Sequence, residues 1–143
     1  MQNLSNILVE EYAARVRLGV ELIQIYDCLC DRTRLRILHL LLEGPLCVCH
    51  FQEVLREPQV KISKHLGYLK RNGLVQAERC RNMMIYGLPE KSNRQLQANL
   101  ACLQDCAREE KVFRADAARL AKLRASFSEN VPVCVREPGA KCI

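Results

Sequence analysis

The chain has 143 residues and a net charge of +6; 49% of its residues are hydrophobic and 27% are charged. This composition is ordinary for a folded globular protein, and the length suits one domain with at most a helical extension. No apolar run approaches the roughly 20 residues that span a bilayer, and residues 1–11 lack the basic-then-apolar pattern of a secretion signal. We therefore expect a cytoplasmic protein with no membrane partner.

The sequence predicts several helices between its first residues and Leu55. The first thirty residues carry apolar stripes at helical spacing, and Gly19 marks a break between two helices. Asp31 is a favourable N-cap for the next helix, whose leucine-rich sequence predicts burial up to Gly44-Pro45. A short helix is expected from about Cys47 to Leu55.

The next helix is the first element with a clear functional pattern. It follows Pro58, places apolar residues on one face, and stops at Asn72-Gly73. Its opposite face is polar and basic. Two short helices joined by a tight turn, the second basic on its outer face, are typical of a helix-turn-helix.

After Gly73 the periodicity changes. Two β-prone runs flank a polar turn around residues 80–82, and Pro89 closes this predicted hairpin. The order of elements predicts a mainly α fold with a small β-hairpin, the winged helix-turn-helix. The basic helix can enter the major groove of DNA, while the hairpin tip lies over the neighbouring backbone. The predicted DNA-contacting residues are Gln59, Lys61, Ser63, Lys64, His65, Tyr68, Arg79, Arg81 and Asn82. For His65 and Tyr68, packing in the interior is the alternative.

The remainder of the chain reads as helix from Ser92 to about Phe127, followed by an irregular tail. We divide the chain into a DNA-binding domain with an N-terminal dimerisation helix at 1–90, dimerisation helices at 91–128 and a cysteine-containing tail at 129–143. The apolar helices on both flanks carry more apolar surface than a small winged helix can cover. They predict a homodimer suited to inverted-repeat operator DNA.

Nine cysteines make the chemistry of the chain distinctive. In a reducing compartment, a cysteine-rich protein more often binds metal or senses redox state than builds disulfides, and an odd count fits a closed disulfide framework poorly. No cysteines are spaced as Cys-x-x-Cys, and no glycine-rich phosphate loop is present. Catalysis is therefore not expected.

Three stretches in sequence order carry a family resemblance. They are CDRTRLRIL at residues 30–38, PLCVCHF at 45–51 and KISKHLGYLKRNGLV at 61–75. Together the chain resembles the ArsR/SmtB family of metal-responsive repressors, although Arg32 stands where proline is usual. The resemblance implies a homodimeric repressor that binds operator DNA without metal and releases it with metal, and it implies metal ligands at Cys47 and Cys49.

Physical chemistry also favours these two cysteines as ligands. A thiol at a helix N-terminus has a lowered pKa, and the thiolate is the ligand form. Thiolates select soft ions, so arsenite or antimonite comes first, with cadmium or lead second. Side chains two residues apart on a regular helix point in nearly opposite directions. Both sulfurs can reach one ion only if Cys47 lies off the helix or the first turn unwinds.

The third ligand is open, since Gln52 occupies the position of the family's third cysteine. Candidates on the tail are Cys134 and Cys142. Cys102 and Cys106 share one helix face, where core packing in the dimer helix is slightly favoured over a second chelating site. Cys28 and Cys30 are expected to pack, and Cys80 is expected to have no role.

The predicted mechanism is that the ion distorts the short helix and so displaces the recognition helix that it supports. A thiol-based redox sensor of the same fold is the alternative.

Overall fold

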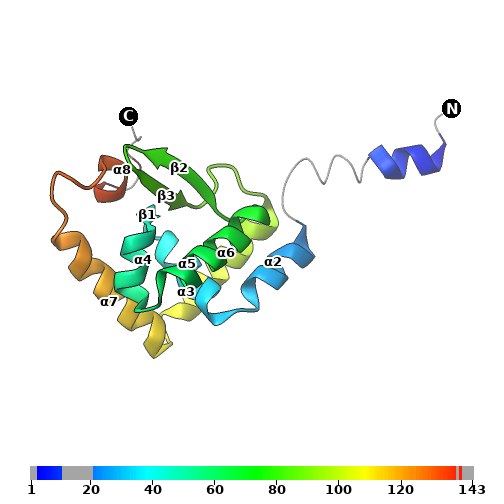
Figure 1. Cartoon of the computed structure of the whole chain (residues 1–143). Coiled ribbons are helices and arrows are strands. Elements are labelled where there is room, and N and C mark those ends of the chain that lie inside the picture. Colours follow the sequence, from blue (N-terminus) through cyan, green and yellow to red (C-terminus); the bar gives the residue numbers. More distant parts are fainter. Residues whose placement is uncertain (1–2, 11–20, 138, 140–143) are drawn as a thin grey trace.

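The computed structural model describes residues 3–10, 21–137 and 139 (Figure 1). Its helices are α2 (Leu22–Leu29), α3 (Arg32–Leu41), α4 (Val48–Leu55), α5 (Gln59–Arg71), α6 (Arg94–Ala107), α7 (Lys111–Ala125) and α8 (Val133–Arg136). Its strands are β1 (Leu46–Cys47), β2 (Gln76–Cys80) and β3 (Met83–Gly87). Residues 4–10 are also helical and lie apart from the other elements in Figure 1. The predicted break at Gly19 lies outside the described residues.

Helices α3, α4 and α5 form the helix-turn-helix and its support. Asp31 caps α3 as predicted, because its carboxylate accepts a hydrogen bond from the backbone N–H of Arg34 at 2.9 Å. The apolar spacing of α5 buries Ile62, Leu66 and Leu69 against α3 and α4. Its other face stays exposed, as a recognition helix requires.

The β-sheet has one strand more than the predicted hairpin. Strands β2 and β3 pair in antiparallel fashion around a two-residue turn at Arg81-Asn82, which confirms the wing. The third strand, β1, pairs with β3 through Leu46–Tyr86 and Cys47–Ile85. Two residues are too few to show strand periodicity, so the sequence did not indicate β1. Its consequence is that Cys47 is joined to the wing.

The C-terminal helical pattern is two helices rather than one. Residues 108–110 separate α6 from α7, and the apolar pattern continues across the break because both helices pack on α3. The tail also differs from the expected irregular segment. A short helix, α8, forms there and buries Cys134 and Val135.

Unpartnered apolar surface is concentrated in the N-terminal part of the described chain. The apolar side chains of α6 and α7, by contrast, bury within the same chain at Leu96, Leu100, Phe113 and Leu120. The described helices include none that is both long and apolar enough to cross a membrane. The exposed large apolar residues of the N-terminal part are Leu4, Ile7, Leu8, Val9, Leu22, Ile23 and Tyr26.

Candidate metal centre and nucleic-acid interface

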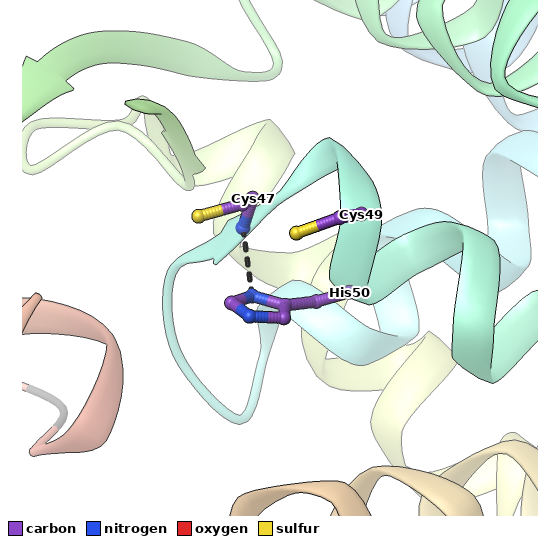
Figure 2. Close-up of side chains that lie close together, drawn as sticks. All are labelled: Cys47, Cys49 and His50. Carbon is purple, nitrogen blue, oxygen red and sulfur yellow. Dashed lines mark hydrogen bonds between the residues drawn. The ribbon is translucent and has the colours of Figure 1, made fainter. Parts of the chain in front are cut away.

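Cys47 lies off the helix, as chelation requires. It is the N-cap of α4, with an extended backbone (φ −86°, ψ 163°), while Cys49 lies in the first helical turn. Because Cys47 is extended, its side chain need not point away from that of Cys49, as it would if both residues lay on a regular helix. The ligand atoms of Cys47, Cys49 and His50 all lie within 4.8 Å of one another (Figure 2). Cys47 and His50 are buried, and Cys49 is exposed.

The start of α4 is held by a capping box built from two of these side chains. The backbone N–H of Cys47 donates to His50 Nδ1 at 3.2 Å, shown dashed in Figure 2, and the Cys47 side chain accepts from the backbone N–H of His50. His50 was not predicted as a site residue. An acceptor side chain three residues after an N-cap was the available signal, and it required knowing that the helix starts after Cys47.

Burial dominates the protonation of this cluster. Burial, with smaller contributions from the nearby Cys49 and from Cys134, raises the pKa of Cys47 to about 12. The lowered pKa expected from the helix N-terminus is therefore wrong for Cys47, because desolvation outweighs the helix dipole. Burial also lowers the pKa of His50. An ion that bound Cys47 would therefore have to displace a proton from it.

The other cysteines fall into distinct environments. Cys134 is buried in α8 and is among the groups that raise the pKa of Cys47, but its sulfur is not one of the ligand atoms grouped within 4.8 Å. Cys102 and Cys106 are both exposed in the single chain, and their expected packing within the dimer stays a prediction. Cys28 is buried as expected, whereas Cys30 is exposed. Cys80 is buried at the end of β2, and Cys142 lies outside the described residues.

The C-terminal end of α4 is held by a buried ionic network. Asp116 of α7 is fully buried and accepts two hydrogen bonds from Arg36 at 2.7 Å and one from Arg119 at 2.5 Å. The two guanidinium groups also donate to the last carbonyls of α4. Arg119 reaches Val54 at 2.6 Å, and Arg36 reaches Leu55 at 3.3 Å. These contacts tie α3, α4 and α7 together.

The predicted DNA-contacting residues of α5 divide into two groups. Gln59, Lys61, Ser63 and Lys64 are exposed on its outer face, where Lys61 forms an ion pair with Glu57 at 3.0 Å. The remaining two pack partly against the start of α3. The guanidinium of Arg34 lies 4.4 Å from the centre of the Tyr68 ring, and His65 Nδ1 lies 3.9 Å from the Asp31 carboxylate.

The wing presents its basic residues at the tip. Arg79, Arg81 and Asn82 are all exposed there. Arg81 has φ of 58°, in the left-handed region where a side chain is strained and glycine is favoured. An arginine at this turn position places a cation at the outermost point of the hairpin.

Comparisons with known proteins agree with this architecture. Residues 31–77 match the model of the bacterial regulatory protein arsR family. The arsenic resistance transcriptional regulator ArsR1 of Pseudomonas putida is 34% identical over 100 residues, covering 69% of this chain and 77% of that protein. The chain belongs to the ArsR family. It is a DNA-binding transcriptional regulator, and the prediction of a regulator rather than an enzyme is confirmed.

Another curated relative and a solved structure also match. An uncharacterized HTH-type transcriptional regulator of Methanocaldococcus jannaschii is 46% identical over 57 residues, which are 39% of this chain and 64% of that protein. Among solved structures, reduced HlyU from Vibrio cholerae is similar with a TM-score of 0.53 and 26% identity, over 68% of this chain and 94% of that one. The predicted winged helix-turn-helix is confirmed.

Proposed function

We propose that this regulator is a homodimeric cytoplasmic repressor that releases operator DNA when arsenite or antimonite binds Cys47 and Cys49. The observation that carries the proposal is the position of Cys47 off the helix, within 4.8 Å of the other ligand atoms. The similarity to an arsenic resistance regulator supports trivalent arsenic as the inducer. In binding, each thiol proton leaves with a hydroxide of arsenous acid as water while an arsenic–sulfur bond forms. No electrons are transferred.

The ion and the helix cap compete for the same atom. The Cys47 sulfur that accepts the backbone N–H of His50 is also the sulfur that would bind arsenic. Losing an N-cap interaction costs roughly 0.5–2 kcal/mol, so the bound ion favours an altered first turn of α4. Binding shifts the equilibrium only by the difference in ion affinity between the two states of this turn.

Displacement of the first turn of α4 would affect both DNA-contacting elements, α5 and the wing. Cys47 pairs with Ile85 in the wing, and α4 packs directly on α5. The far end of α4 is held by Arg36 and Arg119. Movement at the start of α4 therefore tilts the helix about a fixed end and changes the spacing between recognition helix and wing.

The identity of the third ligand would determine which of the candidate ions the site prefers. Trivalent arsenic prefers sulfur, so Cys134, which lies near enough to act on Cys47, is the proposed third ligand for it. A Cys₂His set with His50 suits a cadmium or zinc ion instead. Cys134→Ser should weaken the arsenite response and spare the cadmium response, while His50→Gln should do the reverse. If the same variant were the more impaired in both the arsenite and the cadmium response, this assignment would be contradicted.

The main experiment measures DNA release. A duplex selected from a random library by the wild-type protein is labelled, and its fluorescence anisotropy is followed during arsenite addition. Cys47→Ser/Cys49→Ser should keep operator binding and ignore arsenite. Cys30→Ser is the matched control, since it removes an exposed thiol outside the cluster. Release of the double variant by arsenite would overturn the assignment.

The same assay tests the DNA interface. Lys64→Ala and Arg81→Ala remove exposed cations from α5 and from the wing tip. Each should weaken binding and lower the slope of log affinity against log salt by about 1. Lys61→Ala should have a smaller effect because Lys61 already pairs with Glu57. Unchanged salt slopes for all three variants would place the DNA elsewhere.

The homodimer is proposed from the uncovered apolar residues at 4–9 and 22–26. Ile23 is 72% exposed, and the same apolar surface of a second chain would bury it. Ile23→Glu should shift the wild-type dimer towards monomer in sedimentation velocity. Helices α6 and α7 also belong to the proposed interface, although their apolar side chains mostly pack within the chain. A monomeric wild-type protein would contradict the dimer.

Redox sensing is the second candidate, because the similar HlyU was solved in a form named as reduced. A disulfide between Cys47 and Cys49 would require thiolate character, which the raised pKa of Cys47 disfavours. Mass spectrometry after peroxide and after arsenite separates the two functions. A loss of two protons without added arsenic, accompanied by DNA release, would favour the redox sensor.

A further inference from the structure

Cys102 and Cys106 form a second pair of thiols on a face of α6 that is exposed in the single chain. Their sulfur atoms lie 3.9 Å apart and share one hydrogen bond, and both side chains are exposed. The pair is one helical turn apart, so the backbone of α6 itself sets the spacing. The pair is separate in sequence and fold from the cluster at the start of α4.

This spacing fits a bridging ion and not a disulfide. Two sulfurs bound about 2.3 Å from one tetrahedral ion are about 3.8 Å apart, close to the distance observed. A disulfide needs Cβ atoms about 3.5–4.5 Å apart, whereas Cβ atoms one turn apart on a helix are about 5–6 Å apart. Oxidation would have to unwind α6, but ion binding would leave the helix intact.

The charges around the pair favour a cation. Asp105 and Glu109 lie close enough for their carboxylates to act on Cys106. Asp105 lies on α6 between the two cysteines, and Glu109 lies in the turn that follows the helix. The pair also lies in the last turns of α6, where the free carbonyl groups make the helix end electronegative. A neutral arsenous acid molecule gains little from these charges, but a divalent cation gains from all of them.

We propose that Cys102 and Cys106 form a second ion site on α6 that takes a divalent thiophilic cation of the zinc and cadmium class. The two thiols lose their protons to solvent, both thiolates bind the ion, and water or the flanking carboxylates complete its coordination. No oxidation is involved. The site acts independently of the thiols at the start of α4.

The test uses the full-length protein carrying Cys47→Ser/Cys49→Ser, with all thiols reduced. Cadmium is titrated while the thiolate-to-metal charge-transfer band is followed in the ultraviolet. We expect one cadmium ion per chain to bind this protein. Adding Cys102→Ser/Cys106→Ser should abolish that band or weaken the affinity at least about tenfold. These exposed substitutions should leave the helical circular dichroism unchanged.

A spacing variant serves as the matched control. Gln104→Cys/Cys106→Ser keeps the number of thiols but places them two residues apart, on nearly opposite sides of α6. It should bind cadmium as weakly as the variant lacking both thiols. Asp105→Asn/Glu109→Gln should weaken cadmium binding severalfold while leaving binding of phenylarsine oxide, a neutral dithiol reagent, unchanged.

Two results would overturn the second site. One is equal cadmium affinity and stoichiometry with and without Cys102 and Cys106. The other is full binding by the spacing variant, which would show that any two thiols suffice. Because no DNA is present and the α4 thiols are absent, neither result bears on the proposed arsenite response.

Discussion

The two ends of α4 are held by very different interactions. At its start, a buried thiol and a neutral imidazole form the capping box between Cys47 and His50. At its end, Arg36 and Arg119 bind the terminal carbonyls while both pair with the buried Asp116. The first set consists of modest neutral hydrogen bonds, and the second consists of short charge-assisted ones.

The difference shows which end of the helix a ligand can move. The atoms that hold the start of α4 belong to the cluster of Cys47, Cys49 and His50 that an ion would bind, whereas the described contacts at its end include none of these side chains. A helix held firmly at one end and weakly at the other converts a local binding event into a tilt. Substitutions at each end test this asymmetry.

The largest expected effect lies at the firmly held end. Asp116→Ala leaves Arg36, whose side chain is only 12% exposed, without its carboxylate. Breaking one partner of a buried pair costs about 3–5 kcal/mol, and urea unfolding should show a loss of this size. Asp116→Asn, which keeps one acceptor, should lose less. A loss below about 1 kcal/mol for the alanine variant would mean that this end is not firmly held.

The next effect concerns the imidazole at the weakly held end. His50→Ala removes the acceptor of the buried Cys47 N–H and the ring contact with Phe127 at 4.8 Å. We expect a loss of about 1–3 kcal/mol in the free energy of unfolding. His50→Gln restores an acceptor common at this helix position and should recover much of that loss. Equal losses for the two variants would show that the hydrogen bond is unimportant.

A smaller effect is expected when the two thiols are compared with each other. Cys47→Ala removes the capping sulfur, with an expected loss of about 1 kcal/mol. Cys49→Ala changes an exposed residue and should stay within about 0.5 kcal/mol of wild type. Thermal unfolding of the ion-free variants measures both. If Cys49→Ala were the more destabilising, the capping role of Cys47 would be wrong.

The smallest effect is a pH dependence at the α3–α7 contact on the firmly held side. Burial lowers the pKa of His39 below 6.5, and its Nδ1 is buried without a hydrogen-bond partner in the described structure. As the pH falls through 6.5, His39 is therefore protonated in the unfolded chain before it is protonated in the folded protein. This difference lowers the stability of the native state below that pH. His39→Phe keeps the edge contact with Phe113 and should flatten this slope. Urea unfolding on both sides of pH 6.5 measures the change.

Local patterns accounted for much of the fold. The cap at Asp31, the apolar face of α5 and the two β-prone runs around Arg81 depend on neighbours in sequence and appear as predicted, except that Val60 in the first turn of α5 is exposed. The side-chain spacing of Cys102 and Cys106 was likewise correct. The apolar spacing of α6 likewise indicates its buried face, which holds Leu96, Leu100 and Ala107.

The sequence by itself determined the helix-turn-helix and its hairpin, the basic helix and the thiols at the start of a short helix, because each arises from residues a few positions apart. The tertiary structure alone decided that Cys47 is buried and joined to the wing, and that Asp116 meets Arg36 across 80 positions. Burial and long-range pairing depend on the desolvation and the partners that folding supplies. For this reason the same thiol that a helix terminus would acidify has its pKa raised to about 12 in the folded protein.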